Sequence, residues 1–264
     1  MTGLLAALAA VFGLIIGSFL NVVIARVPAG ESIVRPGSRC AACQTPIAAR
    51  DNVPVLGWLL LRGRARCCGE PIAVRYPLVE AGTALAFAGV LWWALQRPGT
   101  AWALPAFLYL AAVSIALAVI DLDTLRLPFG IVAPSYPVAA VLLGLASWAG
   151  HDLSSAVRML IGGAALWGLY RVLHLVYPAG MGYGDVRLAG VLGLYLGWLG
   201  WAPLAVGAFL GFLVGGVGGA LLLALRRTGL KTAIPYGPYL LGGTWLGVVA
   251  GAPVGQWYLR SMGL

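Results

Sequence analysis

Eight long apolar stretches dominate the sequence and leave few folds open to it. A stretch of about 20 apolar residues is what an α-helix needs to cross a membrane, and a helix satisfies its own backbone amides there. The chain is 61% hydrophobic and 9% charged, which is too apolar for the surface of a water-soluble globule. We therefore expect an all-α polytopic integral membrane protein with eight spans, at roughly 3–25, 79–96, 101–120, 129–149, 155–177, 186–199, 202–225 and 237–257.

The basic residues set the expected orientation of these spans. Cytoplasmic loops of membrane proteins carry an excess of lysine and arginine. Of the 17 basic residues, all but three lie in or beside the segments 26–78, 121–128, 178–185 and 226–236. We expect these segments in the cytoplasm and both termini outside. The net charge of +9 then serves contact with anionic lipid headgroups of the bilayer, and we expect no nucleic-acid partner.

The polar segment after the first span sets the expected domain organisation. No internal repeat, linker or low-complexity tract is evident in the chain. We expect a first transmembrane helix at 1–25, a cytoplasmic insertion at 26–78 and a membrane-embedded core at 79–264. The first apolar run has neither the basic start nor the small-residue cleavage site of a secretory signal, so we expect it to remain as a helix.

Two acidic residues lie at the cytoplasmic ends of predicted spans. Asp121 follows the third span in ALAVIDLDTLRLP, and Asp185 precedes the sixth in GMGYGD. A carboxylate at this depth is costly and marks a candidate functional residue. Alternatively, Asp185 is a helix N-cap, or either acid pairs with a nearby arginine. If the two carboxyls meet, they hold one proton between them and can activate water for peptide hydrolysis.

Three glycines, Gly180, Gly182 and Gly184, precede Asp185 in the expected loop. Glycine permits a positive φ and lets another chain approach closely, which suits a site that receives an extended peptide. Helix direction suggests separate roles for the two acids. Asp121 at a helix C-terminus favours the protonated form and is the predicted acid, whereas Asp185 at a helix N-terminus favours the anion and is the predicted base.

All four cysteines, Cys40, Cys43, Cys67 and Cys68, lie in the expected cytoplasmic insertion. Thiols stay reduced in the cytoplasm, so four of them in one short segment indicate a structural zinc site instead of disulfides. Adjacent cysteines chelate one ion less readily than a spaced pair. A site with three cysteine ligands, or none, is therefore the alternative.

Seven segments, in chain order, carry a resemblance: GSFLNVVIARVP, SRCAACQTPI, DNVPVLGWLLLRGR, PIAVRYPLVE, IDLDTLRLP, GMGYGD and IPYGPYL. They resemble the bacterial type IV prepilin peptidases, which are membrane-embedded aspartyl proteases of the GxGD type. The resemblance implies that Asp121 and Asp185 are the catalytic pair and that Asp123 takes no part. It also implies an inner-membrane enzyme that cleaves the basic leader of type IV prepilins or pseudopilins on the cytoplasmic side.

The resemblance further implies N-methylation of the new N-terminus with S-adenosylmethionine, an activity attributed to the cytoplasmic region. Glu80, in RYPLVE, is the residue expected to contact the cationic amine or sulfonium. Alternatively, Glu80 is an ordinary acid at a helix start.

Two positions depart from the family pattern. Ala65 stands where a cysteine is expected, and Phe129 stands where an acidic residue is expected.

Three other functions are compatible with parts of this pattern: a peptidase without methyltransferase activity, a proton- or cation-coupled transporter, and an inactive membrane scaffold. Both acids lie at one boundary instead of near the membrane centre, which argues against the transporter. The intact GMGYGD segment argues against the scaffold. The sequence does not identify the prepilin, the pilus or secretion system served, or the oligomeric state.

Overall fold

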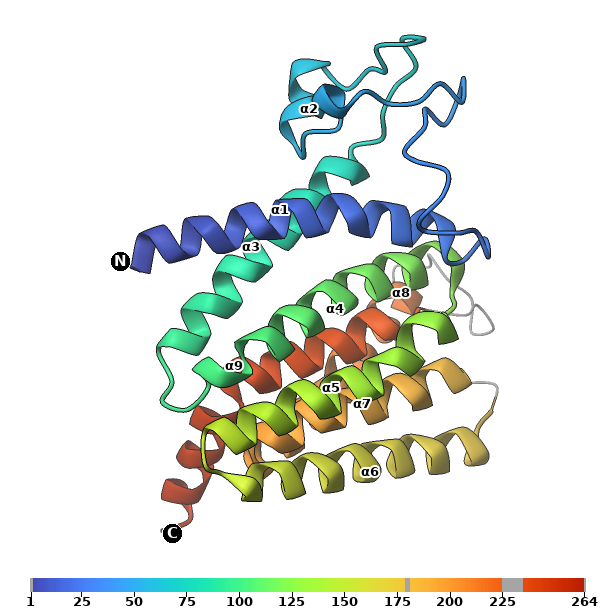
Figure 1. Ribbon diagram of the computed structural model, residues 1–264. Coiled ribbons are helices and arrows are strands. Elements are labelled where there is room, and N and C mark those ends of the chain that lie inside the picture. The colour runs from blue at the N-terminus through green and yellow to red at the C-terminus, as the bar shows by residue number, and fades with distance from the viewer. Residues whose placement is uncertain (1, 179–180, 225–234, 264) are drawn as a thin grey trace. The chain divides into compact units, whose positions relative to one another are not determined.

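The computed structural model describes residues 2–178, 181–224 and 235–263 (Figure 1). Among these residues there is no β-sheet, only two isolated β-bridges, so the all-α prediction is confirmed. Three short helical segments, Ala49–Asp51, α2 (Leu56–Leu60) and Ala101–Ala103, accompany the long ones. The long helices of the described residues are α1 (Thr2–Arg26), α3 (Arg75–Leu95), α4 (Leu104–Thr124), α5 (Phe129–Ala149), α6 (Leu153–Val176), α7 (Tyr183–Leu199), α8 (Trp201–Ala224) and α9 (Gly237–Ser261).

Each of the eight apolar stretches coincides with one of these long helices. The ends of each helix lie within four residues of the predicted ends. Six helices among the described residues are long and apolar enough to cross a membrane: α1, α3, α4, α5, α6 and the first 18 residues of α8. The chain is therefore a multi-pass membrane protein. The helices α7, with 17 residues, and α9 are not among the six, so the count of eight spans stays a prediction.

The chain forms two compact units, Met1–Ala116 and Leu117–Leu264, and α4 contributes to both. In the first unit α1 packs along α3. A Cβ atom on Gly13 or Gly17 of α1 would lie 2.7 Å from a backbone Cα of α3, so neither position has room for a side chain. Small residues four apart are typical of membrane helices that pack closely. The predicted boundaries at residues 25 and 78 stay predictions.

In the second unit, α7 packs against α5, α6, α8 and α9. Every residue from Asp185 to Trp198 is buried except Arg187. A helix that is apolar on all sides is one surrounded by other helices, and Figure 1 shows α7 running alongside α5 and α6. The sequence of α7 thus carries Asp185 into the interior of this unit.

Glycines allow the helices of the second unit to approach closely. A Cβ atom on Gly162 of α6 would lie 2.6 Å from the carbonyl oxygen of Gly193 and 2.8 Å from the Cα of Gly197, both on α7. The α8–α9 contact has the same character, because a Cβ atom on Gly247 would lie 2.6 Å from the Cα of Gly207. These glycines therefore serve close packing at the helix crossings.

Replacing Gly162 with alanine should destabilise the protein, because the added methyl group meets the backbone of α7, which cannot move aside without separating the helices. Overpacking of this kind typically costs about 1–3 kcal/mol. Thermal unfolding of detergent-solubilised protein measures the effect. The matched control is Gly168→Ala in the same helix, where a Cβ atom would have nothing within 4 Å. Equal melting temperatures for the two variants would contradict the close α6–α7 crossing.

Candidate functional site

Asp121 lies inside the last turn of α4, and its side chain is buried. Its Oδ2 atom accepts a hydrogen bond of 2.9 Å from the backbone N–H of Gly237, the first residue of α9. The span end predicted at residue 120 was early, because the helix continues to Thr124. The chain then turns at Leu125, which has a φ of +53°.

Asp185 is the third residue of α7 and is also buried. Its Oδ2 atom accepts a hydrogen bond of 3.1 Å from the backbone N–H of Gly182. The residue that caps the helix is therefore Gly182, and the N-cap alternative for Asp185 is wrong in detail. A carboxylate at the third helical position satisfies the first backbone N–H from inside the helix.

The structure brings these two acids into one neighbourhood. Their carboxylates are near enough to interact through their charges. Leu127, in the segment between α4 and α5, links the two sides, because a Cβ atom on Gly184 would lie 3.0 Å from its Cβ and one on Gly237 would lie 3.2 Å from its Cδ2. Two acids that are about 60 positions apart along the chain thus lie in one neighbourhood.

Both carboxylates face the start of a helix. Asp185 accepts its hydrogen bond at the N-terminus of α7, and Asp121 accepts one at the N-terminus of α9. The assignment of Asp121 as acid and Asp185 as base assumed that Asp121 faces only the C-terminus of its own helix. The Gly237 N–H removes that difference, so helix direction does not separate the roles of the two acids.

The three glycines of the GMGYGD segment differ in what the structure shows. Gly180 lies outside the described residues. Gly182 has a φ of −69°, so it does not use the positive φ that glycine permits, and its role here is to offer its N–H to Asp185. Gly184 serves close approach, since a side chain there would meet Leu127.

Two tyrosines belong to this site that the sequence did not single out. The hydroxyl groups of Tyr170 on α6 and Tyr236 before α9 lie 3.4 Å apart, and both interact electrostatically with Asp185. Tyr236 and Gly237 fall within IPYGPYL, which contributed to the resemblance but received no role. Tyr170 lies in an ordinary apolar helix and carried no sequence signal.

The cysteines of the first unit lie on two loops with the same backbone pattern. A β-bridge joins Arg39 to Pro46, and another joins Arg64 to Pro71, 25 residues later. Each loop holds equivalent backbone hydrogen bonds: Cys40 and Gln44 in one correspond to Ala65 and Gly69 in the other. This internal repeat was missed in the sequence because Ala65 occupies the position equivalent to Cys40, and Cys67 occupies the position equivalent to Ala42.

The four sulfur atoms nevertheless converge. All four Sγ atoms lie within 4.8 Å of one another, with Cys43 and Cys67 3.2 Å apart and Cys40 and Cys68 3.7 Å apart. Four sulfurs bound to one zinc ion at about 2.3 Å in a tetrahedron would be about 3.8 Å apart. The donor set and its geometry therefore fit zinc, even though the second pair of cysteines is adjacent in sequence.

The protonation of these thiols is uneven. A hydrogen bond with the Thr45 hydroxyl lowers the pKa of the Cys43 thiol to about 6, whereas the neighbouring Cys43 sulfur raises the pKa of Cys67 to about 12.

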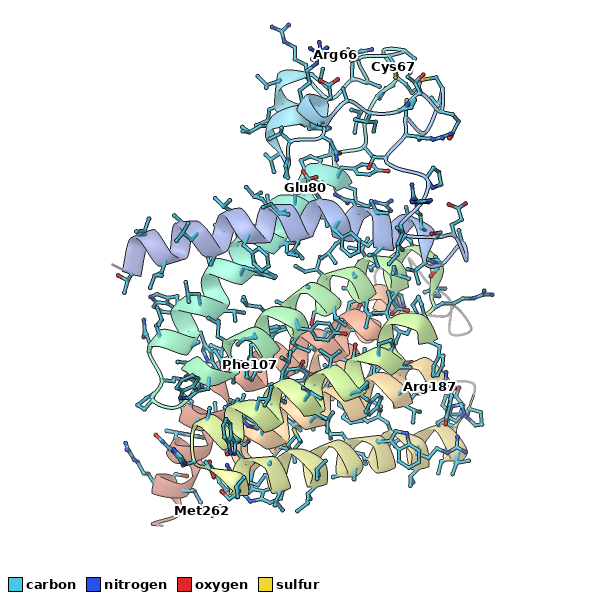
Figure 2. All side chains as sticks on the ribbon, viewed as in Figure 1. Arg66, Cys67, Glu80, Phe107, Arg187 and Met262 are labelled. Atoms are coloured by element: carbon cyan, nitrogen blue, oxygen red, sulfur yellow. The ribbon has the colours of Figure 1, made fainter. Side chains whose placement is uncertain are left out.

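An ion pair anchors the second of the two cysteine loops. Arg66 donates to both carboxylate oxygens of Asp51 at 2.9–3.0 Å, and this pairing lowers the pKa of Asp51. Figure 2 shows Arg66 and Cys67 together in the insertion.

Glu80, in the second turn of α3, has a structural contact that was not predicted (Figure 2). Its buried carboxylate accepts a hydrogen bond of 2.7 Å from the backbone N–H of Val55. Val55 has a φ of +61°, a conformation that a β-branched residue rarely adopts. Glu80 therefore holds a strained loop in place. Its second oxygen forms no hydrogen bond among the described residues.

Glu80 also lines a cavity of about 620 Å³ in the first unit. The end of α1, the insertion and the start of α3 form its walls, which include Asn21, Cys40 and Trp58. Asn21 donates a hydrogen bond of 3.1 Å to the carbonyl oxygen of Tyr76 and so joins α1 to α3. A cavity of this size is in the range of small-molecule sites.

The fold and the two buried carboxylates define a multi-pass membrane protein with a paired-acid site. Residues 11–94 match the bacterial peptidase A24 N-terminal domain, and residues 108–224 match the type IV leader peptidase family. The chain therefore belongs to the type IV leader peptidase family.

Individual relatives agree over most of the chain. The prepilin leader peptidase/N-methyltransferase of Aeromonas hydrophila is 36% identical over 95% of this chain and 92% of its own length. The protein of the same name from Pseudomonas putida is 37% identical over 92% and 90%. The one from Klebsiella pneumoniae is 41% identical over 70% and 82%. No solved structure matches the chain.

Replacing Glu80 with leucine should release the loop around Val55, because the Val55 N–H then loses its acceptor. Hydrogen–deuterium exchange of peptides covering residues 52–60 should become faster. Glu80→Gln retains an oxygen acceptor and should keep most of the protection. Glu31→Leu, which removes an exposed acid of the same segment, is the control. Unchanged exchange in Glu80→Leu would show that this hydrogen bond does not hold the loop.

Proposed function

We propose that this protein cleaves the basic leader peptide from type IV prepilins or pseudopilins and then methylates the new N-terminal amine. The observation that carries the proposal is the pair of buried acids, Asp121 and Asp185, in a member of the type IV leader peptidase family. The names of the relatives couple the two reactions.

The arrangement supports peptide hydrolysis by water activation. Two carboxyls that share a buried site hold one proton between them, since placing both charges there is costly. The ionised carboxylate takes a proton from water, and the hydroxide adds to the scissile carbonyl carbon. The protonated carboxyl then gives its proton to the leaving amide nitrogen as the C–N bond breaks. Asp121 and Asp185 take these two roles, with no preference between them from helix direction.

The surroundings of the acids support the same role. The hydrogen bonds from Gly182 and Gly237 orient the carboxylates, and the missing side chain at Gly184 lets Leu127 pack closely beside Asp185. We propose that the substrate peptide lies along the segment that contains Gly182 and, in the sequence, Gly180. The substrate peptide then reaches the two acids in an extended conformation, next to the end of the substrate's own apolar helix.

We propose that the acids face the cytoplasm in a bacterial inner membrane, with both termini outside. The bias of the basic residues supports this orientation. The cytoplasmic insertion at 26–78 then carries the cysteine site, and the core at 79–264 carries the protease. A transporter using Asp121 and Asp185 as proton relays is not favoured, because the family is one of peptidases.

Zinc is the metal that the cysteine cluster fits. We propose that Cys40, Cys43, Cys67 and Cys68 bind one zinc ion, which folds a segment with little apolar core of its own. The ion is structural, since four thiolates leave no open position for a substrate or water.

The cavity of the first unit is the proposed site for S-adenosylmethionine, the methyl donor. Its volume suits a ligand of this size, and the Glu80 oxygen that the described residues leave without a hydrogen bond suits the sulfonium or the substrate amine. S-adenosylmethionine supplies the methyl group, while Glu80 and Trp58 line the space that it would occupy.

Replacing either acid with asparagine should lower prepilin cleavage by a factor of at least about 100, because general acid–base catalysis contributes this much or more. The neighbouring Asp123→Asn is the control and should retain cleavage, since this residue is exposed. Mass spectrometry of the product measures cleavage and counts added methyl groups. Cleavage retained by Asp121→Asn or Asp185→Asn would overturn the mechanism, and a product without a methyl group would reduce the function to peptidase alone.

Purified protein should contain close to one zinc ion per chain, and Cys40→Ser should reduce that content. Ala65→Cys should instead bind zinc more tightly, because it places a thiol at the position equivalent to Cys40 in the second loop. Competition with a chromophoric chelator measures the affinity. A zinc content near zero would reject the metal, and an unchanged affinity in Ala65→Cys would contradict the equivalence of the two loops.

A further inference from the structure

We propose that Arg171 and Arg187 form a binding site for the phosphate of an anionic lipid headgroup, built on the aromatic rings of Tyr183 and Phe129. The site lies in the second unit, where α5 and α7 begin and α6 ends. It takes no part in the chemistry proposed for Asp121 and Asp185.

Arg187 is the one residue between Asp185 and Trp198 of α7 that is not buried. Its guanidinium carbon lies 4.5 Å from the ring centroid of Tyr183 and 4.7 Å from that of Phe129. The tyrosine Tyr136 fixes the backbone there by donating a hydrogen bond of 2.6 Å to the Arg187 carbonyl oxygen. A guanidinium stacked on rings keeps the N–H groups at its edge free to bind an anion.

Arg171, on α6, places a second positive charge against the same ring, with its guanidinium carbon 5.1 Å from the Tyr183 centroid. The ring of His174 also packs against Tyr183, at 5.6 Å, and its Nδ1 atom hydrogen-bonds the carbonyl oxygen of Met181. Two guanidinium groups on one tyrosine ring gather positive charge in one place, and such a place attracts an anion.

In the part of the chain that the structure describes, no carboxylate supplies that anion. Among residues 2–178, 181–224 and 235–263, neither arginine forms an ion pair. The nearest acid along the chain, Asp185, directs its carboxylate to the Gly182 N–H instead. At the start of α5, Phe129 offers Arg187 an aromatic ring and no carboxylate.

The depth of the site identifies the anion. Phe129 is the first residue of one candidate membrane span, and Arg171 lies five residues before the end of another at Val176. Side chains at the ends of spans lie among lipid headgroups. A phosphate there accepts paired hydrogen bonds from a guanidinium group. Free phosphate has the same chemistry, so the experiment must separate the two sources.

Native mass spectrometry of the full-length protein, titrated with phosphatidylglycerol in detergent, tests the proposal. Each of Arg171→Gln and Arg187→Gln should weaken retention of one lipid by about fivefold, as expected for one basic residue near an anionic surface. Arg126→Gln is the matched control, because it removes an exposed arginine from the neighbouring α4–α5 segment and should leave retention unchanged. Phosphatidylcholine should bind the unaltered protein more weakly than phosphatidylglycerol.

Phe129→Asp provides a second test that keeps both arginines. The new carboxylate should pair with Arg187 and displace the lipid, so retention should again fall by about fivefold or more. Equal losses in Arg126→Gln and Arg187→Gln would overturn the proposal, as would equal retention of the two lipids. Displacement of phosphatidylglycerol by millimolar inorganic phosphate would assign the site to free phosphate and overturn the headgroup assignment.

Discussion

The hydrogen bond from the Gly237 N–H to the Asp121 carboxylate holds the candidate active site together. It joins residues 116 positions apart and does so in a buried place, where an unpaired backbone donor costs about 1–3 kcal/mol. Its counterpart joins Gly182 to Asp185 at the start of α7. Each acid thus satisfies the first amides of a helix, and each helix start in turn fixes the orientation of an acid.

This arrangement explains why the surrounding positions are small or aromatic. A side chain at Gly237 would lie 2.8 Å from the Asp121 carboxylate oxygen, so only glycine lets α9 begin there. The centre of the unit is filled by α7, which carries Asp185 at one end and glycines against α6 along its length. Tyr170 and Tyr236 complete the wall near Asp185 with two hydroxyl groups that approach each other. Packing and polar contacts therefore converge on the same pair of carboxylates.

The helices were predictable from the sequence because each apolar run is long and bounded by polar or helix-breaking residues. The acids were also predictable, since Asp121 and Asp185 interrupt such runs at their ends. The contact of Asp121 with α9 was not, because hydrogen bonds between distant helices leave no trace in periodicity. The repeat of the cysteine loops was hidden by Ala65, and only backbone bonds reveal it. The contact of Glu80 with Val55 was not predictable, because it depends on a positive φ at Val55 and a valine gives no sequence signal for that conformation.

The central claim is that Asp121 and Asp185 line one site. Cysteine cross-linking tests it directly: Asp121→Cys and Asp185→Cys are combined in a chain whose native cysteines are serine, and a short thiol-reactive cross-linker, a bis-methanethiosulfonate, is added. The account predicts a rapid link between these two positions and none between Asp123→Cys and Asp185→Cys, since Asp123 is exposed. If positions 121 and 185 stay unlinked while 123 and 185 react, the two acids do not form a common site and the account is wrong.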